Sequence, residues 1–591
     1  MNDRAAVKSP ENPGFKPKPR FAKQGVASAL PRAAQHPDPV QNGRVSSNTA
    51  KADKNRTQTA GPWFDSGSVG GECPPPPGLS ACKGPRSASP LPSGHAAGRI
   101  PRSPGAASSK LSGAPVGLCR SVRRGAVGRP IVDQPGVAVS IRAVLDPKVF
   151  KAYDVRGIYP TEVDEEGAYA IGRAFVEQFE PEKIAVGHDM RVTSPAMAAA
   201  VRDGAADAGA DVLELGLVGT EMVYFAVGEL ELDGGAAVTA SHNPKEYTGM
   251  KIVRRGALPV GGESGLLDIR DRALKITGRS ESGGRGRVEP YDIWPAYVDR
   301  VLSFVDVEAI KPLRVVIDAA NGMAGAMLPP VLERLPIKAV RCFFEPDGTF
   351  PNHPPNPLLP ENREFIVAKT LEEGADLGAA FDGDADRCFF VDDTGEFVPG
   401  DFVTALLAAS LLEKEPGAKI IYDLRASWAV PETIERGGGV PLINRVGHAF
   451  IKQRMREEGA AFGGEVSGHY YFREFSQADS GVVPFLLMLE LVSKQGRKLS
   501  EILADYRNRY FLTGELNTPV ADVAGKLAEL QQRFGSEGEV SHLDGVSIDA
   551  GDWHMNVRPS NTEPLLRLNL EARTPELMER KRDEVLAAIR S

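Results

Sequence analysis

Short apolar runs alternate with amphipathic stretches along the chain from about residue 145 onward. Three of the apolar runs are residues 183–187, 210–215 and 235–239. Residues 164–179 instead repeat apolar side chains at helical spacing. This alternation of helices with short strands predicts α/β units with largely parallel sheets. The pattern restarts at Leu313 and again at Ala418, so we predict three successive α/β domains of about 100 to 150 residues each.

The C-terminal part of the chain has a different pattern. Helices are predicted over residues 523–534 and from Pro575 onward, and a strand over residues 565–570. Turn-rich sequence lies between them, which indicates a smaller α+β unit. We therefore expect mixed, largely parallel sheets in three α/β domains and then one α+β domain, at residues 144–297, 298–399, 400–509 and 510–591.

The first 140 residues differ in composition from the rest. They hold 20 basic and 7 acidic side chains, 20 of the 47 prolines and 17 of the 62 glycines. Their net charge is +13 against −21 for the remainder, which together give the −8 of the whole chain. A stretch with so little apolar periodicity buries too little surface to offset its ordering entropy. We therefore predict that residues 1–143 are a disordered, Pro/Gly-rich basic extension.

Three alternatives exist for this extension: an organellar transit peptide, a nucleic-acid-binding arm, and a start site set too far upstream. The proline and glycine content opposes the amphipathic helix of a transit peptide. Scattered charges without a binding motif argue against nucleic acid. An unstructured extension or a misplaced start site therefore remains the preferred interpretation.

The sequence also bears on location and redox chemistry. No apolar run reaches the roughly 18 residues of a membrane span, and the N-terminus lacks the apolar stretch of a secretory signal. The five cysteines show no paired metal spacing, which argues against a zinc site and a disulfide framework. We expect a cytoplasmic protein with neither membrane nor nucleic acid as a partner.

A polar loop follows the apolar run at residues 235–239. It places Ser241 at a strand end, with His242 beside it and Lys251 ten positions further on. Such a serine is a candidate nucleophile whose proton has a nearby acceptor. The alternative is a plain turn, since Ser, His, Asn and Pro are all common in turns.

Three carboxylates, Asp382, Asp384 and Asp386, occupy alternate positions after another apolar run. On an extended backbone they would face one side, where a cation offsets their repulsion. Hard oxygen ligands without His or Cys favour Mg²⁺ or Ca²⁺. An EF-hand does not fit, because its glycine position holds Arg387 and its bidentate Glu position holds Asp393. We predict a metal site here, with a solvated acidic loop as the alternative.

A third loop places Glu465, Ser467 and His469 on alternate positions between glycines. A carboxylate, a hydroxyl and an imidazole that project from one side of a loop can recognise sugar hydroxyls. A plain glycine-rich turn is the alternative.

A fourth loop combines a guanidinium, two hydroxyls and an amide in Arg558, Ser560, Asn561 and Thr562. With successive backbone N–H groups, such a cluster forms a cradle for a phosphate dianion. An ordinary polar turn is the alternative.

Together with residues 150–157, these loops resemble the α-D-phosphohexomutase family, in its phosphomannomutase/phosphoglucomutase branch. The matching motifs appear in family order and at family-like spacing, at residues 150–157, 239–244, 382–387, 464–469 and 558–562. The resemblance implies a four-domain, heart-shaped enzyme with its site in a central cleft, to which each domain contributes one loop.

The resemblance also implies the reaction. Ser241 would carry a phosphoryl group, and the three aspartates would hold Mg²⁺ together with a phosphoserine oxygen. The phosphoserine would convert a hexose monophosphate into a hexose 1,6-bisphosphate, which returns its other phosphoryl group to the serine. This interconverts hexose 1-phosphate and hexose 6-phosphate for sugar-nucleotide and polysaccharide precursors, with glucose 1,6-bisphosphate or mannose 1,6-bisphosphate as activator. A monomer or weak homodimer is expected.

The remaining chemistry needs cations and a proton carrier. Arg387 and Lys251 can neutralise charge on the transferring phosphoryl group alongside Mg²⁺. Proton transfer at the sugar hydroxyl needs a group that titrates near neutrality; the candidates are Lys251, His242 and His448. The second phosphate is expected at the Arg558 loop, with Tyr153 and Arg156 at the cleft.

Two positions bear on specificity. Arg425 stands where the family resemblance leads us to expect lysine, so we expect a phosphate or hydroxyl contact there with altered geometry. Val466 stands where the phosphoglucosamine branch more often has glutamine. We expect turnover of mannose phosphates with appreciable activity on glucose phosphates. The alternatives are a phosphoglucosamine mutase and a catalytically idle sugar-phosphate-binding protein.

Overall fold

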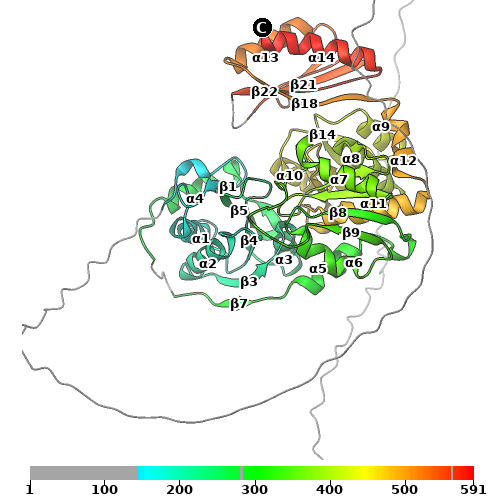
Figure 1. The fold of residues 1–591 in the computed structure, drawn as a ribbon. Coiled ribbons are helices and arrows are strands. Elements are labelled where there is room, and N and C mark those ends of the chain that lie inside the picture. The colour runs from blue at the N-terminus through cyan, green and yellow to red at the C-terminus, as the bar shows by residue number, and fades with distance from the viewer. Residues whose placement is uncertain (1–143, 280–283, 561–563) are drawn as a thin grey trace, which may run out of the picture. The chain divides into compact units, whose positions relative to one another are not determined.

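A computed structural model of the protein describes residues 144–279, 284–560 and 564–591, in which four sheets succeed one another along the chain (Figure 1). The predicted disordered extension, residues 1–143, lies outside the described residues. Three sheets combine parallel and antiparallel pairs with flanking helices, and the fourth is antiparallel. The predicted class, three α/β domains followed by a smaller α+β domain, is confirmed.

The first sheet has the strand order β1-β5-β4-β2-β3-β7, with β6 paired to β5. Its strands are β1 (Val155–Ile158), β2 (Lys183–His188), β3 (Asp211–Leu217), β4 (Gly234–Val238), β5 (Tyr247–Arg254), β6 (Leu258–Pro259) and β7 (Val288–Pro290). Its helices are α1 (Glu165–Phe179), α2 (Ser194–Asp207), α3 (Thr220–Glu229) and α4 (Leu266–Ala273), and α5 (Trp294–Leu302) leads to the next sheet.

Helices cover both faces of this first sheet. Val186 of β2 packs in one hydrophobic core with α1, α2 and α4, whereas its neighbour Ala185 packs in another core with α3. This is the twofold alternation of a strand that is buried on both sides. Helix α1 begins after Asp164, whose side chain accepts a hydrogen bond from the backbone N–H of Gly167, as an N-cap residue does.

The second sheet has the order β12-β11-β10-β8-β9. Its elements are β8 (Arg314–Asp318), α6 (Ala324–Leu332), β9 (Lys338–Cys342), α7 (Glu364–Glu372), β10 (Leu377–Phe381), β11 (Cys388–Asp392) and β12 (Phe397–Val398). The core on the α3 side of the first sheet continues through β8, α6 and β10 into the third sheet. The three α/β domains therefore share one extended hydrophobic core.

The third sheet has the order β14-β13-β15-β16-β17. Its strands are β13 (Lys419–Asp423), β14 (Val440–Asn444), β15 (Phe462–Gly464), β16 (Tyr470–Phe472) and β17 (Ala478–Asp479). Its helices are α8 (Gly400–Lys414), α9 (Ala429–Arg436), α10 (His448–Glu458), α11 (Val482–Gln495) and α12 (Leu499–Arg507).

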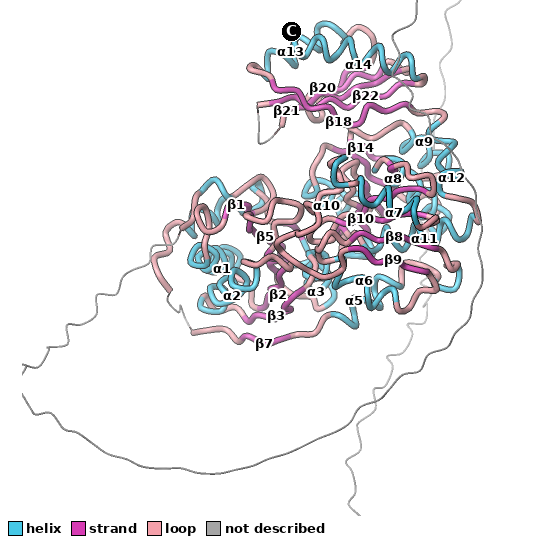
Figure 2. Tube along the Cα trace, viewed as in Figure 1, coloured by secondary structure: helices cyan, strands magenta, loops and turns pink. Residues whose placement is uncertain are grey.

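The fourth sheet has the order β18-β22-β21-β20-β19 and a core of its own. Its strands are β18 (Phe511–Pro519), β19 (Glu539–Ser541), β20 (Val546–Asp549), β21 (Trp553–Pro559) and β22 (Leu565–Ala572). Figure 2 shows its helices, α13 (Val523–Phe534) and α14 (Pro575–Arg590), together on one face of the sheet. Both helices predicted in this part of the sequence are confirmed.

The four loops singled out in the sequence occupy corresponding places in the four sheets. Each joins two antiparallel neighbours: β4 to β5, β10 to β11, β15 to β16, and β21 to β22. In the three α/β sheets the strand before the loop also has a parallel neighbour on its other side. Each of these four loops is therefore held at the end of a β-hairpin.

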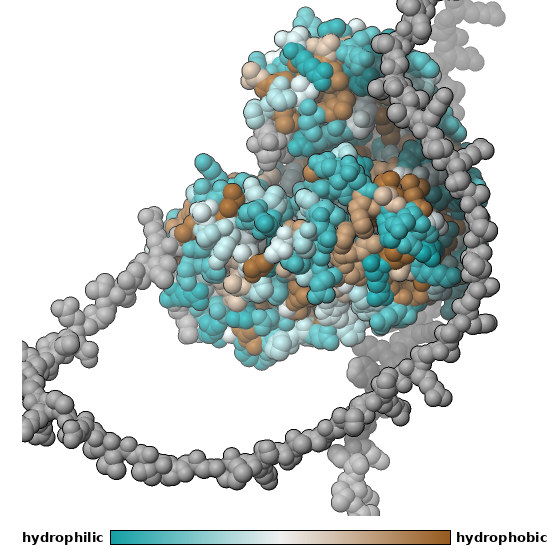
Figure 3. All heavy atoms as spheres, in the orientation of Figure 1, coloured by the Kyte–Doolittle hydropathy of each residue, from teal (hydrophilic) through white to brown (hydrophobic). Residues whose placement is uncertain are grey.

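The apolar residues of the described ranges lie mainly in these cores. On the face drawn in Figure 3, hydrophilic residues are interspersed with smaller hydrophobic areas. Among the helices of the described ranges, none has the length and apolar character that crossing a membrane requires.

Candidate active site

The loop that carries Ser241 is shaped by a buried arginine from a distant part of the chain. Ser241 has a φ of 48°, a left-handed conformation that is costly for a residue with a side chain. The Arg191 guanidinium donates to the carbonyls of Ser241 at 2.8 Å, Asn243 at 2.6 Å, Pro244 at 2.8 Å and Tyr247 at 3.2 Å. Because Arg191 is only 1% exposed, these bonds are shielded from water and fix the loop.

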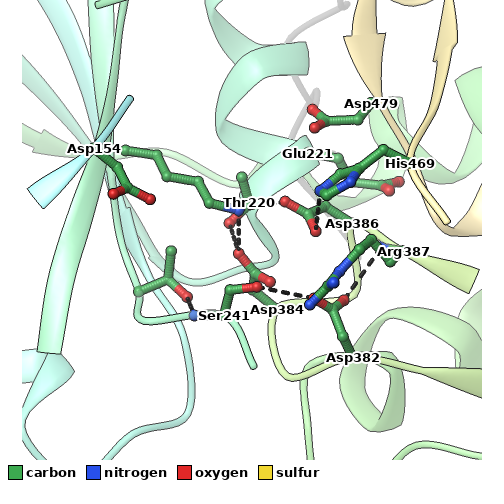
Figure 4. Close-up of polar contacts among 12 residues, drawn as sticks. Asp154, Thr220, Glu221, Ser241, Asp382, Asp384, Asp386, Arg387, His469 and Asp479 are labelled. Carbon is green, nitrogen blue, oxygen red and sulfur yellow. Dashed lines mark hydrogen bonds and ion pairs between the residues drawn. The ribbon is translucent and has the colours of Figure 1, made fainter. Parts of the chain in front are cut away.

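The Ser241 hydroxyl lies against the acidic loop of the second domain (Figure 4). Its Oγ donates to Asp382 Oδ2 at 2.9 Å and lies 3.3 Å from His242 Nδ1. Arg387 Nε donates to the same Asp382 oxygen at 2.8 Å. A Cβ atom added to Gly383 would lie 2.3 Å from the Ser241 carbonyl oxygen, so glycine permits this approach of the two loops.

The three aspartates lie on a turn rather than on the extended backbone that we predicted. Strand β10 ends at Phe381, and Ala385 adopts a φ of 60°. Side-chain oxygens of Asp382, Asp384 and Asp386 nevertheless lie within 4.8 Å of one another. The turn thus brings the carboxylates together, whereas we expected the alternation of an extended strand to do so.

Lys251 of β5 reaches into this carboxylate group. Its Nζ donates to Asp384 Oδ2 at 2.8 Å and also to Asp386 Oδ2. Thr220, the first residue of α3, donates to Asp384 at 2.5 Å. Burial raises the pKa of Asp386, and the charge of Asp384 raises it further. Burial would also raise the pKa of Asp384, but Lys251 and Thr220 lower it below the ordinary value.

This carboxylate set fits a hard divalent cation. Asp384 Oδ1 and Asp386 Oδ1 are buried and have no hydrogen-bond partner among the residues that the structure describes. Buried carboxylate oxygens without partners are costly unless a cation or a donor satisfies them. The ligand atoms are all oxygens, as Mg²⁺ and Ca²⁺ prefer.

The loop of the third domain that holds Glu465, Ser467 and His469 adjoins the loop that holds the three aspartates. A backbone bridge pairs His469 with Arg387, and His469 Nε2 lies 3.8 Å from Asp386 Oδ1. Ser467 Oγ lies 3.2 Å from His469 Nδ1. Glu465, which is 3% exposed, accepts hydrogen bonds from Tyr471 Oη at 2.5 Å and from the Gly447 N–H at 3.0 Å. The structure therefore brings the second and third predicted loops together.

Three histidines of the site are held neutral at pH 7. Burial, followed by the charge of Lys452, lowers the pKa of His448 to about 4. Burial and Arg387 hold the pKa values of His242 and His469 well below the usual range. With pKa values below neutrality the three imidazoles are neutral and can accept a proton, but they are weaker bases than the group titrating near pH 7 that we predicted.

The first motif contributes Tyr153 and Arg156. Arg156 pairs with Asp154 at 2.9 Å and donates to the Asn243 side chain of the serine loop at 3.2 Å. The Tyr153 ring lies 5.1 Å from the His448 ring, edge to face. Tyr153 also lines a cavity of about 1010 Å³ together with Asp544 of the fourth domain. Both residues therefore border the site.

The fourth loop shows an arginine cluster that the sequence only partly revealed. Arg558 and Arg567 face each other across β21 and β22, and Arg567 lies 3.4 Å from Ser560 Oγ. Arg425 reaches the same cluster from the third domain through Glu515 of β18, at 3.4 Å. The two remaining residues of the predicted cradle, Asn561 and Thr562, lie outside the described residues.

Several residues of the site were missed in the sequence. They are Arg191, Thr220, Lys452, Asp479, Glu515 and Arg567. Lys452 and Asp479 form a buried ion pair at 2.6 Å, and Asp479, His469 and Asp386 form a second group of possible metal ligands. A lysine in α10 with its charge inside the protein breaks the expected polar pattern, but only the fold identifies its partner.

Comparisons with known proteins agree with this geometry. Four domain models of the phosphoglucomutase/phosphomannomutase family match the chain in order: alpha/beta/alpha domains I, II and III at residues 147–278, 295–395 and 399–510, and the C-terminal domain at residues 515–588. The protein is therefore an α/β enzyme-family member with a four-domain plan.

Relatives of known name and structure support the same assignment. The chain is 44% identical over 446 residues to phosphohexose mutases of Xanthomonas campestris pv. campestris, covering 75% of this chain and 99% of the relative. It is 43% identical over 457 residues to a phosphomannomutase of Salmonella montevideo, with the same two coverages.

A phosphoglucomutase/phosphomannomutase family protein from Burkholderia thailandensis has a solved structure with a TM-score of 0.68 and 33% identity, covering 75% of this chain and 97% of that one. The chain belongs to the phosphoglucomutase/phosphomannomutase family, and the resemblance seen in the sequence is confirmed.

Proposed function

We propose that the protein is a phosphomannomutase that also acts on glucose phosphates and interconverts hexose 1-phosphate and hexose 6-phosphate. The observation that carries this proposal is the Ser241 hydroxyl, placed 2.9 Å from Asp382 beside a set of carboxylates suited to a divalent cation. The names of the relatives, at 43% and 44% identity, support the choice of substrate class.

The proposed reaction has two phosphoryl transfers. First, the bond between phosphorus and Ser241 Oγ breaks as a sugar hydroxyl bonds to phosphorus and gives up its proton. The resulting hexose 1,6-bisphosphate then presents its other end, and its phosphoryl group returns to Ser241 Oγ while a proton returns to the sugar oxygen. Both steps depend mainly on positioning and charge neutralisation.

The chain supplies the groups for these steps. Asp382, Asp384 and Asp386 would hold Mg²⁺, which when bound supplies positive charge to the transferring phosphoryl group. Lys251 and Arg387 add fixed positive charge beside it. His448, whose pKa is lowered to about 4 by burial and Lys452, is neutral and is proposed to take the hydroxyl proton, with His242 and His469 as alternatives. Lys251 does not suit this role, because the effect of burial on its pKa is outweighed by Asp384 and Asp386, which raise the pKa well above the usual range.

Substrate recognition is assigned to the loops of the third and fourth domains. Glu465, Ser467 and His469 are proposed to contact sugar hydroxyls, while Arg425, Arg558 and Ser560 bind the phosphate that does not react. A loop that binds two neighbouring hydroxyls scarcely distinguishes mannose from glucose, which differ only at C2. Because one chain supplies all these loops, we propose that a monomer is active.

The test is turnover of mannose 1-phosphate by the full-length protein with Mg²⁺ and a trace of glucose 1,6-bisphosphate. Mannose 6-phosphate is the expected product, with glucose 1-phosphate as a second substrate. Ser241→Ala should lower kcat by at least about 100-fold, because it removes the covalent intermediate. Ser303→Ala, at an exposed serine, is the matched control. Unchanged turnover of Ser241→Ala would contradict the phosphoserine assignment.

A further inference from the structure

Glu515 of β18 is the meeting point of three arginines from two domains. Its Oε1 pairs with Arg567 at 2.8 Å, and its Oε2 pairs with Arg558 at 3.0 Å and with Arg425 at 3.4 Å. Strands β18, β22 and β21 lie side by side (Figure 1), whereas Arg425 follows β13 of the third sheet. One carboxylate thus joins the fourth domain to the third.

The arginines need a counter-ion when no substrate is present. Arg558 and Arg567 are directly opposite each other on antiparallel strands, an arrangement that destabilises a sheet when both residues carry the same charge. The side chains of Arg425 and Arg558 are only 7% and 8% exposed, so water screens their charges weakly. Buried charges of this kind are tolerated only with a partner of opposite sign.

The guanidinium N–H groups that pair with Glu515 are the same groups that a bound phosphate would need. Ser560, in the loop proposed to bind phosphate, lies 3.4 Å from Arg567. In addition, the Nε atoms of Arg558 and Arg567 are buried with no hydrogen-bond partner in the described part of the chain. These unpartnered donors indicate that the cluster has binding capacity beyond what Glu515 uses.

A charge count shows what Glu515 changes. Three guanidiniums are paired with two carboxylates, Glu515 and Asp423, the latter at 2.9 Å from Arg425, and the charges of Glu465 and Asp544 also act on Arg425 and Arg558. Without Glu515 the cluster would be one unit more positive, which favours a phosphate that is close to a dianion at neutral pH. Glu515 therefore competes with a phosphate for the three guanidiniums.

We propose that Glu515 is a resident counter-ion of the cluster formed by Arg425, Arg558 and Arg567, and that the phosphate of the substrate displaces it. This inference rests on the proposed function, in which the hexose bisphosphate must leave the arginine cluster by one end and return by the other. A carboxylate that again pairs with the cluster lowers the free-energy cost of each release. It also keeps the three arginines assembled between substrates.

The test is the affinity of the full-length protein for inorganic phosphate, measured by titration calorimetry. Glu515→Gln removes the competing charge and keeps the shape of the side chain. We expect the dissociation constant for phosphate to fall about twofold to fivefold, the range expected when one partly exposed charge is removed. The KM for mannose 1-phosphate should fall in parallel, while kcat should not rise.

Thermal unfolding with and without phosphate provides a second measurement. Glu515→Gln should unfold at a lower temperature than the wild type without phosphate, because the arginines lose their counter-ion. Saturating phosphate should restore most of this difference. If Glu515 were only a scaffold, the variant would bind phosphate more weakly and stay equally destabilised, and either result would overturn the inference.

Two further variants complete the experiment. Glu539→Gln makes the same charge change at an exposed residue of β19, on the opposite edge of the same sheet, and should leave phosphate binding unchanged. Glu515→Asp keeps the charge but shortens its reach, so its phosphate affinity should lie between those of the wild type and Glu515→Gln. Weaker phosphate binding in Glu515→Asp would overturn the inference even if Glu515→Gln does not fold.

The outcomes separate this inference from the proposed function. Binding of inorganic phosphate needs no turnover, so absence of mutase activity in the wild type would contradict the proposed function alone. An active protein whose phosphate affinity is the same in Glu515→Gln and wild type would contradict the role of Glu515 alone.

Discussion

At the scale of single residues, the site depends on buried charges that hold one another in place. Arg191 illustrates this best, because one guanidinium holds the shape of the loop that carries Ser241, the proposed nucleophile. Its four carbonyl acceptors come from residues 241–247. The planar fork of arginine can serve several acceptors at once, whereas an ammonium group cannot reproduce that geometry.

Arg191→Lys should therefore lower kcat by about 10- to 100-fold, since displacement of a reacting group by about 1 Å has effects of this size. The KM for mannose 1-phosphate should change little, because Arg191 contacts the serine loop and not the phosphate cradle. The measurement is steady-state kinetics together with the fraction of Ser241 phosphorylated by glucose 1,6-bisphosphate, determined by mass spectrometry. Arg202→Lys, in a part-exposed ion pair on α2, is the control; equal phosphorylation and kcat in both variants would contradict the role of Arg191.

The carboxylate loop leads to a second residue-scale prediction. Two buried oxygens, Asp384 Oδ1 and Asp386 Oδ1, have no hydrogen-bond partner among the described residues. Lys251 alone does not satisfy the hydrogen-bonding capacity of the two carboxylates. Incubation with excess EDTA should abolish turnover, and Mg²⁺ should restore it. Ca²⁺ should restore less, because its longer and less regular coordination fits a phosphoryl group poorly. Full activity in excess chelator would count against the metal site.

At the scale of helices and strands, polar groups at element ends join the third domain to the fourth. Ser427, just before α9, donates to Glu571 of β22 at 2.8 Å, and the Trp428 N–H donates to the same carboxylate at 3.0 Å. Asp401, in the first turn of α8, lies beside this junction and accepts from the Ser427 N–H at 3.3 Å. The junction is therefore polar, in contrast to the shared apolar core of the first three domains.

Asp401 should make stability depend on pH. Burial, and then the charge of Glu571, raise its pKa to about 7. With this raised pKa, Asp401 keeps a proton in the folded protein that it loses in the unfolded chain above about pH 4. The stability of the folded protein therefore falls as pH rises from about 4 to 7. Asp401→Asn abolishes this pH dependence, so relative to the wild type the variant should gain about 2.5 kcal/mol of stability between pH 5 and pH 8.

Thermal unfolding at pH 5, 6, 7 and 8 measures this effect. The Tm of Asp401→Asn should fall less steeply with pH than the Tm of the wild type. Asp268→Asn, at an exposed position in the first turn of α4, should follow the wild-type profile. Parallel profiles for Asp401→Asn and wild type would show that Asp401 is ionised in the folded protein at all these pH values.

The elements also show which features a sequence can predict. Helix 523–534 was predicted at the bounds of α13, because amphipathic spacing and the capping residue Asp522 act locally. The acidic loop was predicted to be extended but forms a turn. The residues alone did not distinguish the two, because strand alternation and a turn with one left-handed residue both bring carboxylates together. Arg191 and Glu515 could not be predicted. The carbonyls that Arg191 contacts lie 50 or more residues away, and the arginines around Glu515 lie between 43 and 90 residues away.

At the scale of the whole molecule, the four loops are gathered by two kinds of contact. The first three domains share an apolar core, and a backbone bridge between Arg387 and His469 joins the aspartate loop to the loop of residues 465–469. The fourth domain has a separate core and is joined to the third by ion pairs and hydrogen bonds. Polar junctions of this kind are typical of domains that move relative to one another.

The extent of the family match bears on the N-terminal 140 residues. The family match begins at residue 147, and the relatives named above are covered over 99% of their length by 75% of this chain. Every proposed catalytic and binding residue lies between Tyr153 and Arg567. Removal of residues 1–140 should therefore leave kcat and KM for mannose 1-phosphate within about twofold of the full-length values, as expected for a segment that supplies none of these residues.

Kinetics and thermal unfolding of the shortened protein, measured beside the full-length protein, test this prediction. The cut leaves Val144 in place, whose N–H donates to Asp164 at the start of α1 at 3.1 Å. A cut after residue 164 would remove that N-cap and β1 and should lower stability, because α1 and β5 would lose their partners. If removal of residues 1–140 alone abolished turnover or folding, the extension would be part of the working enzyme.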